Sequence, residues 1–250
     1  MADIPDSHPR KSSLLARAKL VQAAAEGLLA ESAMIAHGRG EAFDYMLGEE
    51  TSDSAKKSIQ EAAARLLEAN NPVISMNGNS TVLAGKHAIR AASIIGCPVE
   101  VNIYYRTEER MAKLITTLES WKNEIAKEDP RANRVEILGS EADGRIRGLK
   151  GPRALCSSRG IEMADVILVP LEDGDRCEAL INQGKQVIAV DLNPLSRTAR
   201  MATVTIVDEV TRAMKTLCEI LNERPESTNW NNKQNLREAL KIMSQASERV

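Results

Sequence analysis

The stretch 166–190, VILVPLEDGDRCEALINQGKQVIAV, decides the fold. It begins and ends in short apolar runs, 166–169 and 187–190, and both are rich in β-branched residues, which favour buried strands. A helix-length segment near 176–183 separates the two runs. The stretch therefore predicts a strand–helix–strand unit with parallel strands.

The same alternation continues on both sides of this unit. Further apolar runs at 73–76, 99–104, 135–138 and 204–207 predict strands, and the segments near 83–95, 108–127 and 209–222 predict helices. Together they predict an α/β fold, a Rossmann-like three-layer domain with a mostly parallel sheet of about six strands.

Two helical regions flank this core. Helical periodicity precedes it in an N-terminal helical segment, and a C-terminal helix near 232–247 follows a polar linker, 223–231. We expect one structural domain overall, divided into residues 1–70, 71–222 and 223–250. The stretch 140–160 holds four glycines and five basic residues, and we interpret it as an irregular excursion.

Composition excludes several classes of protein. The net charge of −2 argues against a general nucleic-acid binder, and only 2% of the residues are aromatic, which leaves few platforms for base stacking. No apolar stretch approaches the roughly 18–20 residues of a membrane helix. The four cysteines form no CxxC pair, so we expect no structural zinc site and a reducing, cytoplasmic compartment.

Unusual residues follow the predicted strands, where open parallel sheets bind ligands. After 73–76 come Asn77, Gly78 and Asn79 at the start of a helix. Free backbone N–H groups at such a position bind anions, although an ordinary capped turn has the same composition.

The two strands of the deciding unit are also followed by charged residues. Glu172, Asp173 and Asp175 could hold Mg²⁺ on a polyphosphate or form a solvated acidic turn. Asp191 ends the next strand, where a ribose-binding carboxylate often lies, and Arg197 follows with a guanidinium suited to phosphate.

The segment 35–45 is a further candidate. Glycines on both sides of Arg39 allow the backbone to approach a ligand, and the guanidinium suits phosphate. The alternative for Arg39 is a structural salt bridge with Glu41 or Asp44. The alternative for His37 is a hydrogen-bonded, partly buried histidine. Neither GxGxxG nor the P-loop pattern is present, so a nucleotide site would be of another kind.

Six blocks of the sequence resemble the archaeal phosphopantothenate synthetases, also called 4-phosphopantoate–β-alanine ligases. They are IPDSHPR at 4–10, HGRGEAFDY at 37–45, ISMNGN at 74–79, PLEDGDR at 170–176, DLNPLSRTAR at 191–200 and IVD at 206–208. The resemblance implies a homodimeric ligase of coenzyme A biosynthesis. Such an enzyme joins 4-phosphopantoate to β-alanine and splits ATP to AMP and pyrophosphate.

The resemblance also implies a set of ATP contacts. They fall on Arg17, Arg39, Asp191, Leu192, Asn193, Arg197, Thr198, Glu209 and Val210. Glu209 departs from the family pattern, which usually has asparagine there, so the side chain cannot make the same contact to adenine.

We expect the reaction to proceed through an acyl-adenylate, with Arg39, Arg197 and Mg²⁺ offsetting the charge of the triphosphate. The substrate would lie on Asn77–Asn79, and Arg106 is a candidate for its phosphate unless it pairs with Glu109. His37 is a candidate base for the attacking amine. Two alternatives are a kinase or phosphatase of a phosphorylated small acid and a non-catalytic ATP sensor.

Overall fold

A computed structural model describes residues 4–170 and 173–249. Its α-helices are α1 (Lys11–Ala25), α2 (Ser32–Leu47), α3 (Asp53–Glu68), α4 (Gly78–Ile95), α5 (Glu108–Ile125), α6 (Gly174–Asn182), α7 (Arg197–Met201), α8 (Val210–Glu223) and α9 (Asn232–Ser244). Its strands are β1 (Pro72–Met76), β2 (Val99–Val101), β3 (Ile137–Leu138), β4 (Gly144–Arg145), β5 (Leu155–Cys156), β6 (Val166–Pro170), β7 (Gln186–Val190) and β8 (Val204–Ile206).

The main sheet has six strands in the order β3-β2-β1-β6-β7-β8, and every neighbouring pair is parallel. The predicted α/β class and strand number are therefore confirmed. The order reverses between β1 and β6, where the chain leaves one half of the sheet and starts the other. Such a reversal opens a crevice beyond the carboxyl ends of the strands.

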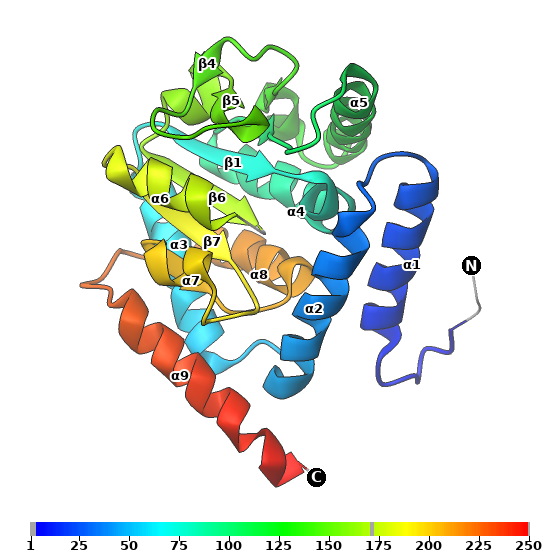
Figure 1. Cartoon of the computed structure of the whole chain (residues 1–250), viewed down its shortest axis with the longest axis vertical. Coiled ribbons are helices and arrows are strands. Elements are labelled where there is room, and N and C mark those ends of the chain that lie inside the picture. Colours follow the sequence, from blue (N-terminus) through cyan, green and yellow to red (C-terminus); the bar gives the residue numbers. More distant parts are fainter. Residues whose placement is uncertain (1–3, 171–172, 250) are drawn as a thin grey trace.

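Helices cover both faces of the sheet, which explains the continuous apolar runs (Figure 1). Alternate side chains point to opposite faces: Leu168 joins the core cluster under α3, α4, α5 and α8, whereas Ile167 and Val169 join the cluster under α6. The second cluster also includes Ile146 and Ile161 from the segment between β3 and β6. Two apolar layers thus enclose the sheet.

The excursion at 140–160 contains a small second sheet, in which β4 and β5 pair antiparallel. The fully buried carboxylate of Glu100, in β2, accepts the backbone N–H groups of Ser157 (2.9 Å) and Ile161 (2.8 Å). A Cβ on Gly160 would lie 2.0 Å from Glu100 Oε2, so this close approach requires glycine. The excursion is therefore fastened to the main sheet.

The N-terminal helices α1 and α2 lie side by side at one edge of the molecule, and α9 packs on the domain beside α2, α3 and α7 (Figure 1). Within the predicted N-terminal helical segment, no helix with the bounds of α2 was predicted, and Gly38 and Gly40 were expected to let the backbone approach a ligand. Instead Gly38 and Gly40 lie inside the helix, and Gly40 faces Leu192. The division into residues 1–70, 71–222 and 223–250 stays a prediction.

Candidate functional site

A cavity of about 760 Å³ lies at the carboxyl ends of β1, β6 and β7. Its walls come from α2 and from the segments that follow β1, β2, β6 and β7, and they include Asn77, Gly78, Asn79, Asp173, Asp191, Leu192, Asn193, Arg197 and Thr198. The three strand ends at which the sequence placed polar candidate residues, those of β1, β6 and β7, therefore meet in one place, beside the reversal of strand order.

The β1–α4 turn forms one wall through a capping box. Asn77 Oδ1 accepts the N–H of Ser80 (3.0 Å), and Ser80 Oγ accepts the N–H of Asn77 (2.8 Å). A Cβ on Gly78 would lie 3.0 Å from Arg110 Nη2 and 3.2 Å from the carbonyl oxygen of Leu28. A side chain at this position would therefore crowd the segment that packs against the start of α4. The first N–H groups of α4 make this terminus a potential anion site.

The β7–α7 loop forms the opposite wall. Asp191 directly follows β7 and accepts the hydroxyl of Ser196 and the N–H of Asn193, the latter at 2.9 Å. Burial raises the pKa of Asp191, while these hydrogen bonds and the nearby charge of Arg39 act in the opposite direction. The carboxylate therefore holds the loop in shape beside the cavity.

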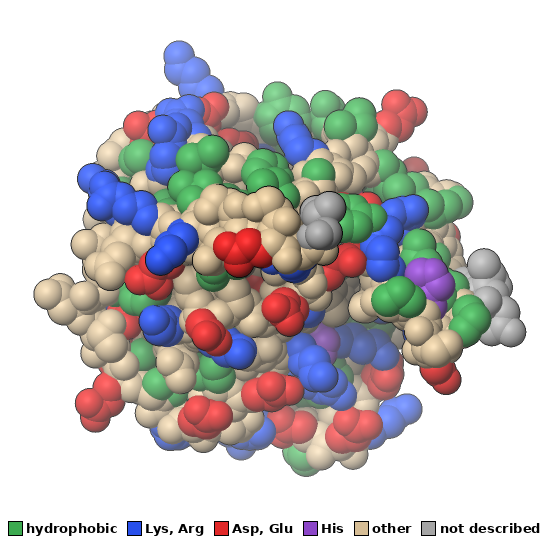
Figure 2. All heavy atoms as spheres, turned by 90° about the horizontal axis from the view of Figure 1, so that it is seen from below, with side chains coloured by type: hydrophobic (Ala, Val, Ile, Leu, Met, Phe, Trp, Pro, Cys, Tyr) green, Lys and Arg blue, Asp and Glu red, His purple; other side chains and the backbone are tan. Residues whose placement is uncertain are grey.

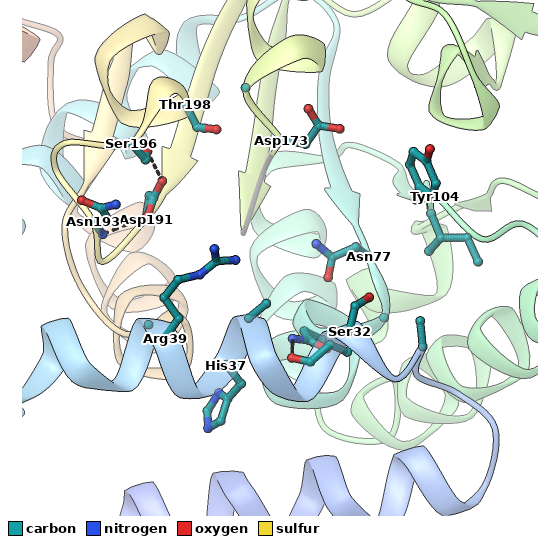
Figure 3. Close-up of a pocket in the computed structure, with 18 of the residues that line it drawn as sticks. Ser32, His37, Arg39, Asn77, Tyr104, Asp173, Asp191, Asn193, Ser196 and Thr198 are labelled. Atoms are coloured by element: carbon teal, nitrogen blue, oxygen red, sulfur yellow. Dashed lines mark hydrogen bonds between the residues drawn. The ribbon is translucent and has the colours of Figure 1, made fainter.

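Arg39 extends from α2 into the space facing Asp191 and Asn193 (Figure 3). Neither Glu41 nor Asp44 pairs with it, because Glu41 binds Arg10 and Asp44 binds Arg212. Within the described ranges, no hydrogen bond or ion pair engages the Arg39 guanidinium. A cation that lines a cavity without such a partner is suited to an anionic ligand.

Arg197 also lines the cavity, at the start of α7, but its guanidinium is already engaged. It donates to the carboxylates of Asp175 and Glu178, both on α6. Its side chain is 52% exposed, so these ion pairs are surface contacts that contribute little and exchange readily. Arg197 can therefore turn to a phosphate at small cost.

His37 belongs to the cavity wall, but its ring points away from Asp191 and Asn77, toward α1 (Figure 3). Burial lowers the pKa of His37, so the neutral imidazole predominates near pH 7. Its Nε2 is buried and has no partner in the part of the chain that the structure describes. The ring is therefore directed away from the space between α2 and the strand ends.

The other predicted residues lie outside the cavity wall. Arg17 binds Glu41 (3.0 Å), and Arg106 donates to the backbone carbonyls of Gly139 and Ser140 rather than to Glu109. Glu209 caps α8 through the N–H groups of Thr211 and Arg212, and the next residue, Val210, is buried. Glu172 lies outside the described residues.

The acidic residues do not form a metal cluster in the described ranges. Asp173 lines the cavity and caps α6 by accepting the N–H of Asp175 (2.9 Å), whereas the side chain of Asp175 pairs with Arg197. No group of three histidine, cysteine or acidic side chains suited to a metal occurs within 4–170 and 173–249. Of the described acidic residues, Asp173 and Asp191 line this wall.

Sequence reasoning missed several residues of the cavity, of which the cations matter most. Arg110 reaches it from α5, and Arg153, only 8% exposed, reaches it from the excursion and lies 3.7 Å from Asp173. Tyr104 and Tyr105 line the wall after β2. The position of these tyrosines at the end of the predicted strand 99–104 was a signal for a site residue. Arg110 lies within a charged helical run that carries no such signal.

The outer surface mixes both charges. On the face seen in Figure 2, basic and acidic side chains are interspersed, in agreement with the net charge of −2. Among the described helices, none combines the length and the continuous hydrophobicity that a membrane span requires. The concentration of cations and helix N-termini around the cavity is therefore local, and suits small anionic ligands.

Comparison with known proteins supports a small-molecule site. The family model for phosphopantothenate/pantothenate synthetase matches residues 54–246. A 4-phosphopantoate–β-alanine ligase of Thermococcus kodakarensis is 47% identical over 89% of this chain and 82% of its own length. A ligase of the same name from Methanosarcina mazei is 44% identical over 96% of this chain and 94% of its own, and one from Methanospirillum hungatei is 46% identical over 88% and 85%.

Proposed function

Because the chain belongs to the phosphopantothenate/pantothenate synthetase family, we propose that its cavity is the active site of a 4-phosphopantoate–β-alanine ligase. The enzyme forms the C–N bond of 4′-phosphopantothenate in coenzyme A biosynthesis. The observation that carries the assignment to this cavity is the meeting of Arg39, Arg197 and the N-terminus of α4 around one space at the sheet crevice.

We propose that ATP occupies the side of the cavity formed by α2 and the β7–α7 loop. Arg39 and Arg197 would contact its phosphates, and Asp191, Leu192, Asn193 and Thr198 would hold the nucleoside. Arg17, Glu209 and Val210 lie outside the wall, so any contact from them requires movement of α1 or a longer ligand path. Mg²⁺ fits as a counter-ion of the polyphosphate, with Asp173 supplying a carboxylate.

The reaction follows from this placement in two displacements. The carboxylate of 4-phosphopantoate attacks the α-phosphorus of ATP, forming an acyl–phosphate bond while pyrophosphate leaves with the electrons of the broken P–O bond. The amine of β-alanine then attacks the acyl carbon and AMP leaves. Arg39 and Arg197 offset the repulsion between two anions and stabilise charge on the leaving pyrophosphate.

No side-chain base is assigned to the second displacement, since the His37 ring points away from the cavity (Figure 3). Adenylates are reactive, and positioning of the amine supplies much of the acceleration. The amine must still arrive uncharged, so we expect the second step to speed up as pH rises toward the pKa of the β-alanine ammonium.

We also propose that the enzyme is a homodimer that associates through α1 and α2. These two helices expose Val21, Ile35, Tyr45 and Met46, and Ile35 is 72% exposed. Exposed apolar side chains gathered on neighbouring helices are typical of protein interfaces. Sedimentation of wild type and Ile35→Glu tests this: the proposal requires a dimer that the charge weakens.

Product analysis tests the proposed reaction. Purified enzyme is incubated with 4-phosphopantoate, β-alanine, ATP and Mg²⁺, and the mixture is analysed by mass spectrometry. We expect 4′-phosphopantothenate, AMP and pyrophosphate in equal amounts. ADP with phosphate would instead support a kinase or phosphatase, and ATP binding without any product would support a sensor.

A further inference from the structure

Arg110 is a half-buried cation with no counter-ion among the residues that the structure describes. Its Nε donates to the carbonyl oxygen of Leu28 (3.0 Å) and its Nη1 to that of Tyr105 (3.2 Å). No described carboxylate forms an ion pair with it, and burial lowers its pKa. Two carbonyl dipoles fix the direction of the guanidinium but leave its full charge uncompensated.

Other partly buried arginines of the described chain show what is missing. Arg65 binds Glu61 at 2.7 Å, and Arg212 binds Asp44 at 2.6 Å. Removing a charge from water is unfavourable unless an opposite charge compensates it. Arg110 lines the cavity, so a bound anion is the partner that its position permits.

The third nitrogen of the guanidinium lies at the start of α4. Nη2 would be 3.0 Å from a Cβ on Gly78, and it makes no hydrogen bond within the described residues. The absence of a side chain at Gly78 therefore brings a free N–H donor of Arg110 beside the first backbone N–H groups of an 18-residue helix. An anion placed here can accept hydrogen bonds from Arg110 Nη2 and from the first backbone N–H groups of α4.

Asn79 adds an independent sign of a missing ligand. It lines the cavity, is only 7% exposed, and its Oδ1 is buried without a partner in the described ranges. Its Nδ2 donates to the carbonyl oxygen of Ala33 (2.9 Å), which fixes the amide so that Oδ1 remains the acceptor. A buried acceptor left unpaired is costly, so a ligand O–H or N–H is expected to satisfy it.

We propose that Arg110, the N-terminus of α4 and Asn79 form the subsite for the acid substrate. Arg110 and α4 bind its phosphate, and Asn79 Oδ1 accepts its 2-hydroxyl. The inference rests on the proposed function, which supplies a substrate with both groups. Arg110 takes the place of Arg106 as the candidate for the substrate phosphate, because the guanidinium of Arg106 donates to the carbonyls of Gly139 and Ser140.

This subsite leaves the two anions on opposite sides of the sheet reversal. Arg110 follows β2, whereas Asp191 and Arg197 follow β7, and β1 and β6 lie between them in the sheet. The phosphate of the acid and the triphosphate of ATP are thereby held apart by separate cations. The carboxylate of the acid is left to face the nucleotide.

Arg110→Met tests the subsite, with Lys113→Met as the matched control. Lys113 lies one turn further along α5 and donates to the carbonyl oxygen of Glu26 (3.0 Å), in the same α1–α2 connection, but it is not part of the cavity wall. We expect Arg110→Met to lower kcat/KM for 4-phosphopantoate about 10- to 100-fold. The KM for ATP and the activity of Lys113→Met should stay near wild type.

The ratio of the kcat/KM values for 4-phosphopantoate and for unphosphorylated pantoate distinguishes phosphate binding by Arg110 from a purely structural role of Arg110. If Arg110 holds the phosphate, Arg110→Met lowers this ratio of kcat/KM values, and Arg110→Lys restores part of it. Equal losses for both acids, or a loss confined to the KM for ATP, would overturn the inference. Should Arg110→Met fail to fold, Arg110→Lys alone must show a smaller loss of the same ratio.

Calorimetric binding keeps this test separate from the proposed reaction. 4-Phosphopantoate is titrated into wild type, Lys113→Met and Arg110→Met without ATP. Weaker binding by Arg110→Met alone supports the subsite even if product analysis finds no ligase activity. Equal binding by all three proteins, or binding by none, contradicts the subsite even where the ligase reaction is confirmed.

Discussion

Arg212 of α8 binds Asp44 of α2, with 2.6 Å between Nη2 and Oδ1. The same nitrogen lies 2.7 Å from Oδ1 of Asp208, whose side chain is fully buried. One guanidinium therefore ties the helix that carries Arg39 to the end of β8 and the start of α8. This contact gives the conspicuous Asp44 and Asp208 a structural role in placing the cavity wall.

Removing this guanidinium should destabilise the protein and loosen α2. Arg212→Met leaves the carboxylates of Asp44 and Asp208 buried without their cation, and we expect the free energy of unfolding to fall by about 3 kcal/mol. Chemical denaturation measures the loss. A change below about 0.5 kcal/mol, the size of an ordinary surface substitution, would contradict the role of this contact.

The contact between α1 and α2 should depend on pH through Glu41. Burial alone would raise the pKa of Glu41, but hydrogen bonds from Ser13, Arg17 and Arg10 lower it to about 2. A carboxyl with a lowered pKa in the folded state stabilises the fold above its unfolded pKa, and this contribution is lost as pH falls toward 2.

Glu41→Gln removes this contribution. We expect wild type to be more stable than Glu41→Gln by up to about 3 kcal/mol at pH 7, and the difference to shrink by roughly half at pH 3. Denaturation curves of the two proteins at both pH values provide the measurement. A difference that does not change with pH would show that Glu41 acts through its shape alone.

Glu209 should act on the stability of α8 rather than on ATP. Its carboxylate accepts the N–H groups of Thr211 (2.9 Å) and Arg212 (3.0 Å). Asparagine is also a good N-cap, so Glu209→Asn should keep stability and leave or improve ATP affinity, whereas Glu209→Ala should cost about 1 kcal/mol. A large loss of ATP affinity in Glu209→Asn would instead give Glu209 a role of its own.

Asn79 should favour 4-phosphopantoate over an analogue that lacks the 2-hydroxyl. Asn79→Ala removes the acceptor, and we expect kcat/KM for 4-phosphopantoate to fall by about 10-fold. An analogue that lacks the 2-hydroxyl should be used equally by wild type and Asn79→Ala. If the variant loses the same factor with the analogue, Asn79 acts through its contact with Ala33 and not through the hydroxyl.

The core of the fold was predictable because its strands are buried on both faces. The runs 166–169 and 187–190 are continuously apolar, and polar residues follow each strand. α2 was not predictable, because its apolar residues do not keep to one side: Leu47 is buried whereas Ile35 is exposed. The pairing of β4 with β5 was not predictable either, because each strand has two residues and is too short to show an alternation of apolar and polar residues.

The site was predictable where it follows the strand ends and not where it depends on contacts distant in sequence. Asn77 and Asp191 come directly after strands, so parallel pairing brings them to one edge. Arg110 reaches the cavity only because the turn before α2 packs on α4 and α5. Arg17 was predicted as a site residue but does not line the cavity, because Glu41 binds its side chain.

Pyrophosphate exchange tests the central claim most directly. Labelled pyrophosphate is added to enzyme, ATP, Mg²⁺ and 4-phosphopantoate without β-alanine, and label entering ATP is measured. An adenylate formed in this cavity predicts exchange that requires the acid and falls about 10²-fold or more in Arg39→Ala. Exchange that needs no acid, or an Arg39→Ala rate equal to wild type, would contradict the account.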